Sequence, residues 1–523
     1  MNTPEFASWR EVGCMNPDGN EPLGVAPAWR PSALSILRRH EGGAVLFHTL
    51  NGCLDVVSGA FGHWLADAWE SRLSHEPLGL SGFYSKHLAG LAARGHVTSL
   101  SLFEEKTLFL QYFRMIRWLN RHLQRQTGYL MLALSYACNL DCPYCFQRDI
   151  RARLGDVRLA PKDIDAIWRQ VQPALCPDVP AHRMCYVLYG GEPLRNRHRD
   201  TVQRLLHHAK AGGAEVEAVT NGLELAGYLD VLGQGPGTIS RLQIALDADP
   251  ACFGGQGHGR ARSDAFALIL AHVEAASQTG VAIDLRLHLQ PARRQALDSL
   301  LDILDKAGLL AMENIHPYAA AIRNVPGEHL DDGLEMVSAE DLARFANHIG
   351  SDVTRHAAAL ARLAVAETGP GPMAAEYCMR AKEHCYLLDP FGDIYACYEE
   401  AGRADRRVGT YGRDGVQLFP SQAGRLEIGS DAMDAVFPFG LLDGGGCVVA
   451  ADLAVCADRH VVRRERTREV LLAALGLFAS QTLSGFTAEE TASGWRAINF
   501  RGDKQRDLPS MLQQLAPYVP REL

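Results

Sequence analysis

The sequence predicts an α/β protein with a parallel sheet at its centre. Short apolar runs recur six times along the middle of the chain, and helix-like patterns lie between most of them. A strand, a helix and a further strand in that order usually form parallel neighbours, so six such units predict a sheet that is curled into a barrel or left open. The expected strands are residues 129–136, 184–189, 215–220, 241–246, 281–289 and 313–318.

Polar residues follow the ends of successive predicted strands. The carboxyl ends of parallel strands meet at one edge of a sheet, where ligands usually bind. Helices expected at 163–175, 200–209, 264–277 and 295–308 would cover the faces and leave this edge open. The polar residues are Cys138, Cys142 and Cys145 after the first strand, Gly190, Gly191, Glu192 and Pro193 after the second, Thr220 and Asn221 at the third, Asp247 at the fourth and Arg286 within the fifth.

Length and composition describe a globular protein of several domains. The chain has 523 residues. Domains usually contain roughly 100–200 residues, so the chain is too long for a single core. A formal net charge of −9 argues against nucleic acid as a partner. Neither a membrane-spanning apolar run nor a signal peptide is expected. Thirteen cysteines without an export signal indicate reduced thiols or metal ligands in a cytoplasmic protein.

Three of these cysteines have a spacing that favours an iron–sulfur cluster. Cys138, Cys142 and Cys145 form a C-x3-C-x2-C pattern that brings three sulfurs onto one loop. A structural zinc ion needs four ligands, and no nearby Cys or His completes the set. Thiolates suit iron–sulfur clusters, and a four-iron cluster held by three cysteines leaves one iron open for a further ligand. A structural zinc site is the alternative.

The segment CNLDCPYC, from Cys138 to Cys145, resembles the signature of the radical S-adenosylmethionine (SAM) enzymes, including the aromatic Tyr144 before the last cysteine. The resemblance implies an α/β fold with a partial (β/α)6 barrel of the radical SAM type and a [4Fe-4S] cluster that binds SAM at its open iron. It also implies reductive cleavage of SAM to a 5′-deoxyadenosyl radical that abstracts hydrogen.

The same resemblance assigns SAM contacts to the strand ends. Glu192 and its loop match the motif that receives the SAM amino group, and Arg286 matches an arginine that meets the SAM carboxylate. The alternative for Arg286 is an inward-facing barrel arginine. Asp247 is followed by Ala248 where related enzymes have glycine. The implied cofactor-binding residues are Tyr144, Gly190, Gly191, Glu192, Pro193, Thr220, Asn221, Asp247 and Arg286.

A second group of cysteines lies downstream. The stretch DPFGDIY predicts a turn between two short strands, with Gly392 in the turn and cysteines on either side. With the following VGTY, this resembles the SPASM or twitch extension of radical SAM peptide maturases, which implies auxiliary clusters. A full SPASM domain has more cysteines, so one auxiliary [4Fe-4S] cluster is expected. Its expected ligands are Cys378, Cys385, Cys397 and Cys447, with Cys456 in reserve for Cys385; structural zinc or core thiols are the alternatives.

The remaining cysteines have no expected role. They are interpreted as buried or incidental thiols. They are Cys14, Cys53, Cys176, Cys185 and Cys252.

The first 120 residues form a separate unit. Residues 42–59 predict two strands joined at Asn51-Gly52, a favoured hairpin turn. Helices at 60–69 and 82–95 and a strand at 96–103 would follow. This outline resembles the winged-helix modules with which maturases of ribosomally made peptides bind a precursor's leader as an added strand. A structural cap on the barrel is the alternative.

Together these resemblances imply a radical SAM maturase that modifies a residue of a ribosomally made precursor peptide. The implied partners are that peptide and an electron donor such as flavodoxin or ferredoxin, with no nucleic acid and no membrane. The alternatives are a sulfatase-type (formylglycine) maturase and a non-enzymatic iron–sulfur or zinc protein. The expected divisions are 1–120 for the peptide-recognition module, 121–335 for the barrel, 336–460 for the auxiliary cluster domain and 461–523 for a helical tail.

Overall fold

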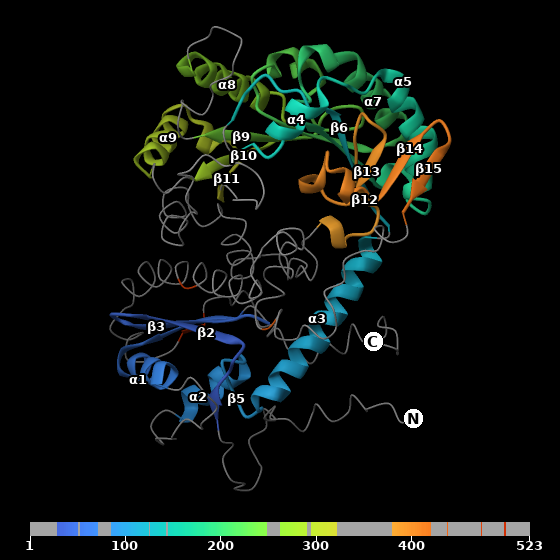
Figure 1. The fold of residues 1–523 in the computed structure, drawn as a ribbon. Helices are drawn as coiled ribbons and strands as arrows, with labels where there is room; N and C mark the ends of the chain where they lie inside the picture. Colours follow the sequence, from blue (N-terminus) through green and yellow to red (C-terminus); the bar gives the residue numbers. More distant parts are fainter. Residues whose placement is uncertain are drawn as a thin grey trace, which may run out of the picture.

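The computed structural model describes most of the chain between residues 29 and 419. It contains a large sheet, a smaller N-terminal sheet and a pair of very short strands (Figure 1). The described residues are 29–50, 53–71, 85–124, 126–142, 145–247, 262–289, 294–321 and 379–419, with Phe437, Leu472, Arg496 and Ala497.

The six predicted central strands form consecutive parallel neighbours of the large sheet, in the order β11-β10-β9-β8-β7-β6. The predicted α/β class with a parallel sheet is therefore confirmed. β11 begins later than expected and extends to Ala321. The strands are β6 (Gly128–Ser135), β7 (Met184–Gly190), β8 (Glu215–Thr220), β9 (Arg241–Asp247), β10 (Ala282–Leu289) and β11 (Ile315–Ala321).

Helices separate most of these strands, as predicted, but the expected helix at 163–175 is interrupted. A π-helical turn, Ile167–Val171, lies between two short α-helices. Pro173 lacks the N–H that a regular α-helix needs at this point, which favours the wider turn. The helices are α4 (Arg148–Leu154), α5 (Pro161–Ala166), α6 (Gln172–Leu175), α7 (Arg199–Gly212), α8 (Arg262–Ser277) and α9 (Arg294–Lys306).

Short 3-10 segments complete the connections around the sheet. The longest of them follows β8 in place of a full helix. They are Ala181–Arg183, Asn196–His198, Leu225–Val231, Leu309–Ala311, Met379–Ala381, Tyr398–Glu400 and Ala404–Arg406.

The alternating side chains of β6 divide between two cores. Leu130 and Leu132 are buried in the main cluster, together with residues of α7 such as Leu205. Met131 and Ala133 point to the other face and join a second cluster. We call this second group the inner cluster; its buried members are Met131, Ala133, Tyr136, Ile150, Val187, Tyr189, Leu387, Tyr395 and Ala401, with Phe146, Met379 and Tyr398 packed against them.

The predicted downstream hairpin extends the same sheet. β12 (Cys385–Leu388) pairs in parallel with β6, and β13 (Asp393–Tyr395) follows after the expected turn, where Gly392 has a φ of 85°. β14 (Gly409–Gly412) and β15 (Gly415–Leu418) add two more strands, giving ten in all among the described residues. Figure 1 shows this orange hairpin beside β6. The downstream segment is therefore continuous with the parallel sheet.

The N-terminal sheet contains the predicted pair of strands and two strands that were not expected. β3 (Gly43–His48) and β4 (Leu54–Ser58) are the predicted pair, and β2 (Ser35–His40) is additional. The short strand β16 (Arg496–Ala497) pairs with the other edge of β4. Helices α1 (Gly59–Ser71) and α2 (Ser85–Ala93) lie where they were predicted.

The strand expected at 96–103 is wrong for most of its length. Only β5 (Val97–Thr98) is extended, pairing with β1 (Arg30–Pro31), and helix α3 (Leu102–Gln124) begins directly afterwards. Ser101 and Glu104 explain this start: each side chain bonds the other's backbone N–H, at 3.3 and 2.7 Å, as in a capping box. α3 continues past residue 120, so a helix connects the module to the barrel (Figure 1).

A buried ion pair holds the N-terminal module together. The Asp55 carboxylate, fully buried, accepts hydrogen bonds from Arg94 Nε and His96 Nε2, both at 2.6 Å. Burial acts to raise the pKa of Asp55, but the bonds and charges of His96 and Arg94 outweigh it and lower that pKa. His96 Nδ1 also lies 3.0 Å from the Ser35 hydroxyl. Ser35, His96 and Asp55 are the residue types of a catalytic triad, but all three are buried, so a substrate cannot reach the serine.

None of the helices within the described part of the chain has the length and apolar character needed to cross a membrane.

We predict that Asp55→Ala destabilises the N-terminal module by about 3–5 kcal/mol, because it leaves a buried guanidinium without its partner. The measurement is a urea denaturation curve in which unfolding of the module is detected by its susceptibility to proteolysis. Arg39→Ala is the matched control, since it removes pairs with Asp67 and Glu70 that are exposed. Equal effects of the two substitutions would contradict this reading of the network.

Candidate functional site

The three-cysteine loop leaves the carboxyl end of β6 and runs into α4. The backbone N–H of Cys145 bonds the Cys142 carbonyl at 3.2 Å, which folds the loop into a turn. The Cys138 sulfur accepts the Leu140 N–H at 3.4 Å. Arg151 of α4 donates to the Leu140 carbonyl at 2.8 Å and holds the loop against the helix. Pro143 and Tyr144 lie outside the described residues.

The glycine loop after β7 packs directly against the backbone that leads into Cys138. The N–H of Gly191 bonds the Ser135 carbonyl at 2.8 Å, and the N–H of Glu192 bonds the Ala137 carbonyl at 3.2 Å. A Cβ on Gly191 would lie 2.4 Å from the Tyr136 carbonyl oxygen and 2.5 Å from that of Ala137. Only glycine permits this approach, which explains the pair of glycines predicted at the site.

Glu192 is buried beneath this loop, with 1% of its surface exposed. Its carboxylate accepts bonds from the Leu194 N–H at 2.9 Å, the Thr220 hydroxyl at 2.7 Å and the Asn221 N–H at 2.7 Å. Burial raises its pKa to about 7, and the three donors oppose that shift only in part. The side chain thus joins the ends of β7 and β8. The Pro193 carbonyl meets His198 Nδ1 at 3.2 Å.

Asn221 completes a network between three strand ends. Its Nδ2 donates to the side-chain oxygen Oδ1 of Asn139 at 2.8 Å and lies 3.7 Å from the Cys138 sulfur. Asn139 in turn donates to Glu224 at 3.0 Å. The structure therefore brings together the predicted cysteine loop, Glu192 loop and Thr220-Asn221 turn. Asn139 was not predicted, although its place beside Cys138 could have indicated a loop-holding role.

Arg286 lies in β10, in register with Ala245 of β9 and Tyr318 of β11. Its neighbours Leu285 and Leu287 belong to the main core, so Arg286 faces the opposite side of the sheet. Its Nε atom is buried and has no hydrogen-bond partner among the described residues. A buried guanidinium nitrogen in this state can bind an anion. Asp247 ends β9, and the position of its side chain lies outside what is described.

Two of the five downstream cysteines can be placed. Cys385 and Cys397 are 4% and 3% exposed. Cys385 begins β12, and Cys397 lies two residues after the end of β13, so both cysteines lie at the open end of the same hairpin. The predicted ligands Cys378, Cys447 and Cys456 lie outside the described residues, as does the C-terminal tail apart from Leu472, Arg496 and Ala497.

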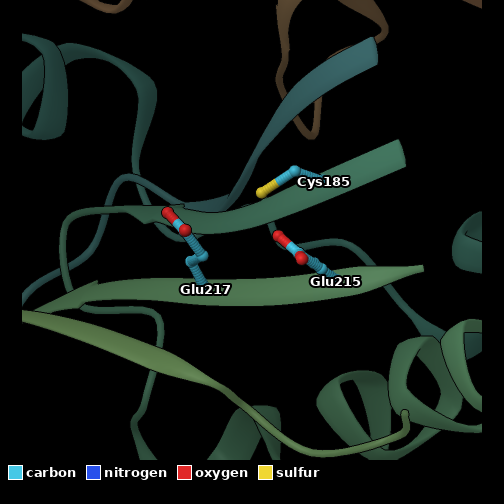
Figure 2. A group of neighbouring side chains, drawn as sticks. All are labelled: Cys185, Glu215 and Glu217. Carbon is cyan, nitrogen blue, oxygen red and sulfur yellow. The ribbon is translucent and has the colours of Figure 1, made fainter. Parts of the chain in front are cut away.

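The cysteines expected to have no role include one with acidic neighbours. Figure 2 shows Cys185 of β7 beside Glu215 and Glu217 of β8, and their donor atoms lie within 4.8 Å of one another. The Arg241 guanidinium lies 3.8 Å from a carboxylate oxygen of Glu217 and 3.0 Å from one of Asp284. A positively charged side chain therefore already accompanies these acidic groups. Burial, Glu217 and Glu215 raise the pKa of the Cys185 thiol, which remains protonated. We interpret this group as an ion-pair cluster.

Cys53 and Cys176 are buried, as expected. Cys14 and Cys252 lie outside the described residues.

The sequence interpretation missed a contact between the cysteine loop and the hairpin. The Tyr136 hydroxyl donates to the Asp389 carboxylate at 3.0 Å, and both residues are 1% exposed. Burial raises the pKa of Asp389 to about 6. The DPFG turn was recognised only as a turn, and nothing local indicates that its aspartate reaches the barrel.

Several solved structures are similar to the chain at low identity. SuiB of Streptococcus suis, bound to precursor peptide SuiA, is 16% identical with a TM-score of 0.40, over 82% of this chain and 97% of SuiB. Native anSMEcpe with bound AdoMet and Kp18Cys peptide is 12% identical with a TM-score of 0.47, over 68% and 99%. The FeFe-hydrogenase maturase HydG of Carboxydothermus hydrogenoformans is 17% identical with a TM-score of 0.29, over 52% and 61%. No family model and no curated protein matches the chain.

We predict that Gly191→Ala pushes the glycine loop away from the cysteine loop, because its Cβ has no space beside two carbonyl oxygens. Overpacking of this kind costs about 1–3 kcal/mol. Thermal denaturation and the alkylation rate of Cys138 in metal-free protein measure the effect, and the rate should rise. Gly412→Ala is the control, since a Cβ there meets no atom within 4 Å. An unchanged alkylation rate in Gly191→Ala would refute the contact.

We also predict that Asp389 makes stability depend on pH. Its folded pKa of about 6 exceeds the usual value near 4, so the folded protein keeps a proton that the unfolded chain releases in that window. Stability contributed by this group is therefore present at low pH and lost as the pH rises through about 6. Asp389→Asn removes this pH dependence of stability. The free energy of unfolding of the variant, minus that of the native protein, should therefore be about 1 kcal/mol larger at pH 8 than at pH 5. Denaturation midpoints at the two pH values check this; a constant difference contradicts it.

Proposed function

We propose that the chain is a radical SAM enzyme that modifies a residue of a ribosomally made precursor peptide. The observation that carries this proposal is the arrangement of three cysteines on one loop, locked by backbone contact to the Gly190-Gly191-Glu192 loop. The signature spacing of Cys138, Cys142 and Cys145 supports the same assignment. The first 120 residues and the downstream hairpin both suit a peptide-modifying member of that class.

The spacing of the sulfurs supports a cluster over a single metal ion. Four thiolates around one zinc ion, at Zn–S bonds of about 2.3 Å, require sulfur atoms roughly 3.8 Å apart. Among the described residues, the one group of three donors within 4.8 Å is that of Cys185, so the three loop sulfurs are spread more widely. A four-iron cluster, which receives each thiolate at a separate corner, suits the wider arrangement.

The residues of the loop would hold and tune this group. Cys138, Cys142 and Cys145 would bind three irons, and the backbone N–H of Leu140 and the side-chain amide of Asn221 already point to the Cys138 sulfur. When bound, the cluster would supply the electron that cleaves SAM to the 5′-deoxyadenosyl radical.

The strand ends would bind and orient SAM. The Arg286 guanidinium would bind the SAM carboxylate on the inner face of the sheet, and Glu192 with Thr220 and Asn221 would keep the surrounding loops rigid. The remaining assigned contacts, at Tyr144, Pro193 and Asp247, are part of the same proposal.

The downstream cysteines would hold one auxiliary [4Fe-4S] cluster. Cys385 at the start of β12 and Cys397 just after β13 lie at the open end of one hairpin, which supports their joint use. Cys378 and Cys447 would complete the set, with Cys456 as the replacement for Cys385.

The N-terminal module would bind the leader of the precursor as an added strand. β4 is paired on both sides, by β3 and β16, whereas β2 has β3 as its one neighbour among the described residues. An extended peptide can pair with such an edge through its main chain. A cytoplasmic setting and an external electron donor such as flavodoxin or ferredoxin belong to the same proposal.

Cys142→Ala tests the assignment. Two four-iron clusters give about eight irons in the loaded native protein, and the variant should keep about four and produce no 5′-deoxyadenosine with SAM and dithionite. Anaerobic iron and sulfide analysis and product chromatography measure both. Cys53→Ala is the control, because this buried thiol lies in the N-terminal module, and it should retain the full iron content and the product.

Deoxyadenosine production by Cys142→Ala at the native rate would overturn the proposed function. Iron content near four in the native protein would remove the auxiliary cluster and leave the barrel cluster in place.

A further inference from the structure

One buried hydrogen bond connects the two cysteine-bearing regions. Tyr136 stands just before Ala137 and Cys138, and its hydroxyl donates to Asp389 Oδ2 at 3.0 Å across 253 positions of the sequence. Both side chains are almost completely buried. The bond therefore lies in the interior, away from competing water, where its loss leaves a polar group without a partner.

Asp389 is fixed by the hairpin that carries it. Its Oδ1 accepts the N–H groups of Phe391 and Asp393, each at 3.0 Å, and its carbonyl accepts the Tyr411 hydroxyl at 2.5 Å. The turn is closed by Gly392, whose φ of 85° few other residues adopt. Asp389 thus cannot shift unless the turn opens.

Tyr136 is fixed by the hairpin turn and by the glycine loop. Its ring stacks on Phe391 with centroids 6.4 Å apart and planes 17° apart. Its carbonyl oxygen is the atom that a Cβ on Gly191 would meet first, at 2.4 Å. The residue is therefore held between the hairpin turn and the glycine loop, and its backbone continues directly into Cys138.

The inner cluster joins the neighbours of both cysteine groups. Phe146, beside Cys145, and Tyr398, beside Cys397, pack against the same buried residues. Tyr189, the residue before Gly190, meets Tyr398 edge-on with ring centroids 5.9 Å apart. In Figure 1 the hairpin lies on the same sheet as β6, with β12 as the direct neighbour of β6 and β13 beyond it. The hairpin is thus in contact with the cysteine loop through several independent groups.

We propose that Asp389 and Tyr136 are positioning residues for the three-cysteine loop. The hairpin turn fixes Asp389, Asp389 fixes the Tyr136 ring, and Tyr136 sets the place of Cys138 relative to the Gly191 loop. This inference rests on the proposed function, because the position of Cys138 determines how a cluster presents its open iron to SAM. The downstream hairpin then controls the geometry of the first cluster in addition to holding the second.

Tyr136→Phe removes the hydroxyl alone and keeps the stacked ring. Tyr395→Phe is the matched control: Tyr395 lies in the same cluster, is equally buried, and donates to Asp393 at 3.4 Å within the hairpin itself. The control therefore loses a hydroxyl without breaking the link to the cysteine loop. Both substitutions replace one neutral side chain with another. A change in the midpoint potential of the cluster therefore cannot be caused by the loss of a charge.

Three measurements on the full chain read the effect. We expect Tyr136→Phe to show faster hydrogen exchange over residues 137–147 in metal-free protein, and a more negative midpoint potential of the barrel cluster because the N–H groups facing the Cys138 sulfur are less well held. We expect the KM for SAM to rise roughly fivefold, as loss of one buried hydrogen bond allows. Tyr395→Phe should match the native protein in all three.

Asp389→Asn provides the rescue, because its amide oxygen can still accept the two turn N–H groups while its NH2 donates to the Tyr136 oxygen. It should keep native exchange rates and native KM, whereas Asp389→Ala should behave like Tyr136→Phe. Identical exchange, potential and KM in Tyr136→Phe and Tyr395→Phe would overturn the inference. If the reconstituted native protein shows no cluster signal by EPR after reduction with dithionite, the proposed function fails instead, and the exchange measurement still decides the positioning role.

Discussion

The contact between two backbone segments is the constraint on which the candidate site depends. Gly190 and Gly191 lie so close to residues 135–137 that any side chain on them would meet carbonyl oxygens. This contact fixes the cysteine loop against the loop that carries Glu192, and Glu192 then bonds Thr220 and Asn221. Three loops that are distant in sequence thereby behave as one rigid edge, which is what a preorganised binding site requires.

Buried carboxylates in this protein have two different environments. Asp55 is surrounded by Arg94 and His96, so its charge is stabilised and its pKa is lowered. Glu192 and Asp389 accept bonds mainly from neutral N–H and O–H groups, so burial prevails and their pKa values rise to about 7 and about 6. The N-terminal module is therefore stabilised by charge pairing, whereas the barrel edge is stabilised by neutral donors around carboxyl groups that titrate near neutrality.

The sequence predicted the parallel strands well because buried strands such as 184–189 and 215–220 are marked by local apolar patterns. The cysteine spacing and the glycine pair were equally local signals. The pairing of β12 with β6 and the Tyr136–Asp389 bond could not be predicted, since contact between residues 253 positions apart leaves no local pattern. The capping pair Ser101 and Glu104 is a local signal for a helix start that the prediction of a strand at 96–103 did not use.

The pairing of β12 with β6 also has a consequence for synthesis of the chain. β6 is the first strand of the parallel sheet to leave the ribosome, yet its second neighbour is made only when residues 385–388 emerge. Until then one side of a buried, apolar strand has unpaired backbone groups, a state that invites pairing with other chains. The nascent parallel sheet therefore remains incomplete on this side of β6 until β12 is made. The hairpin, which is the last part of the sheet to be made, then covers the free edge of the first strand.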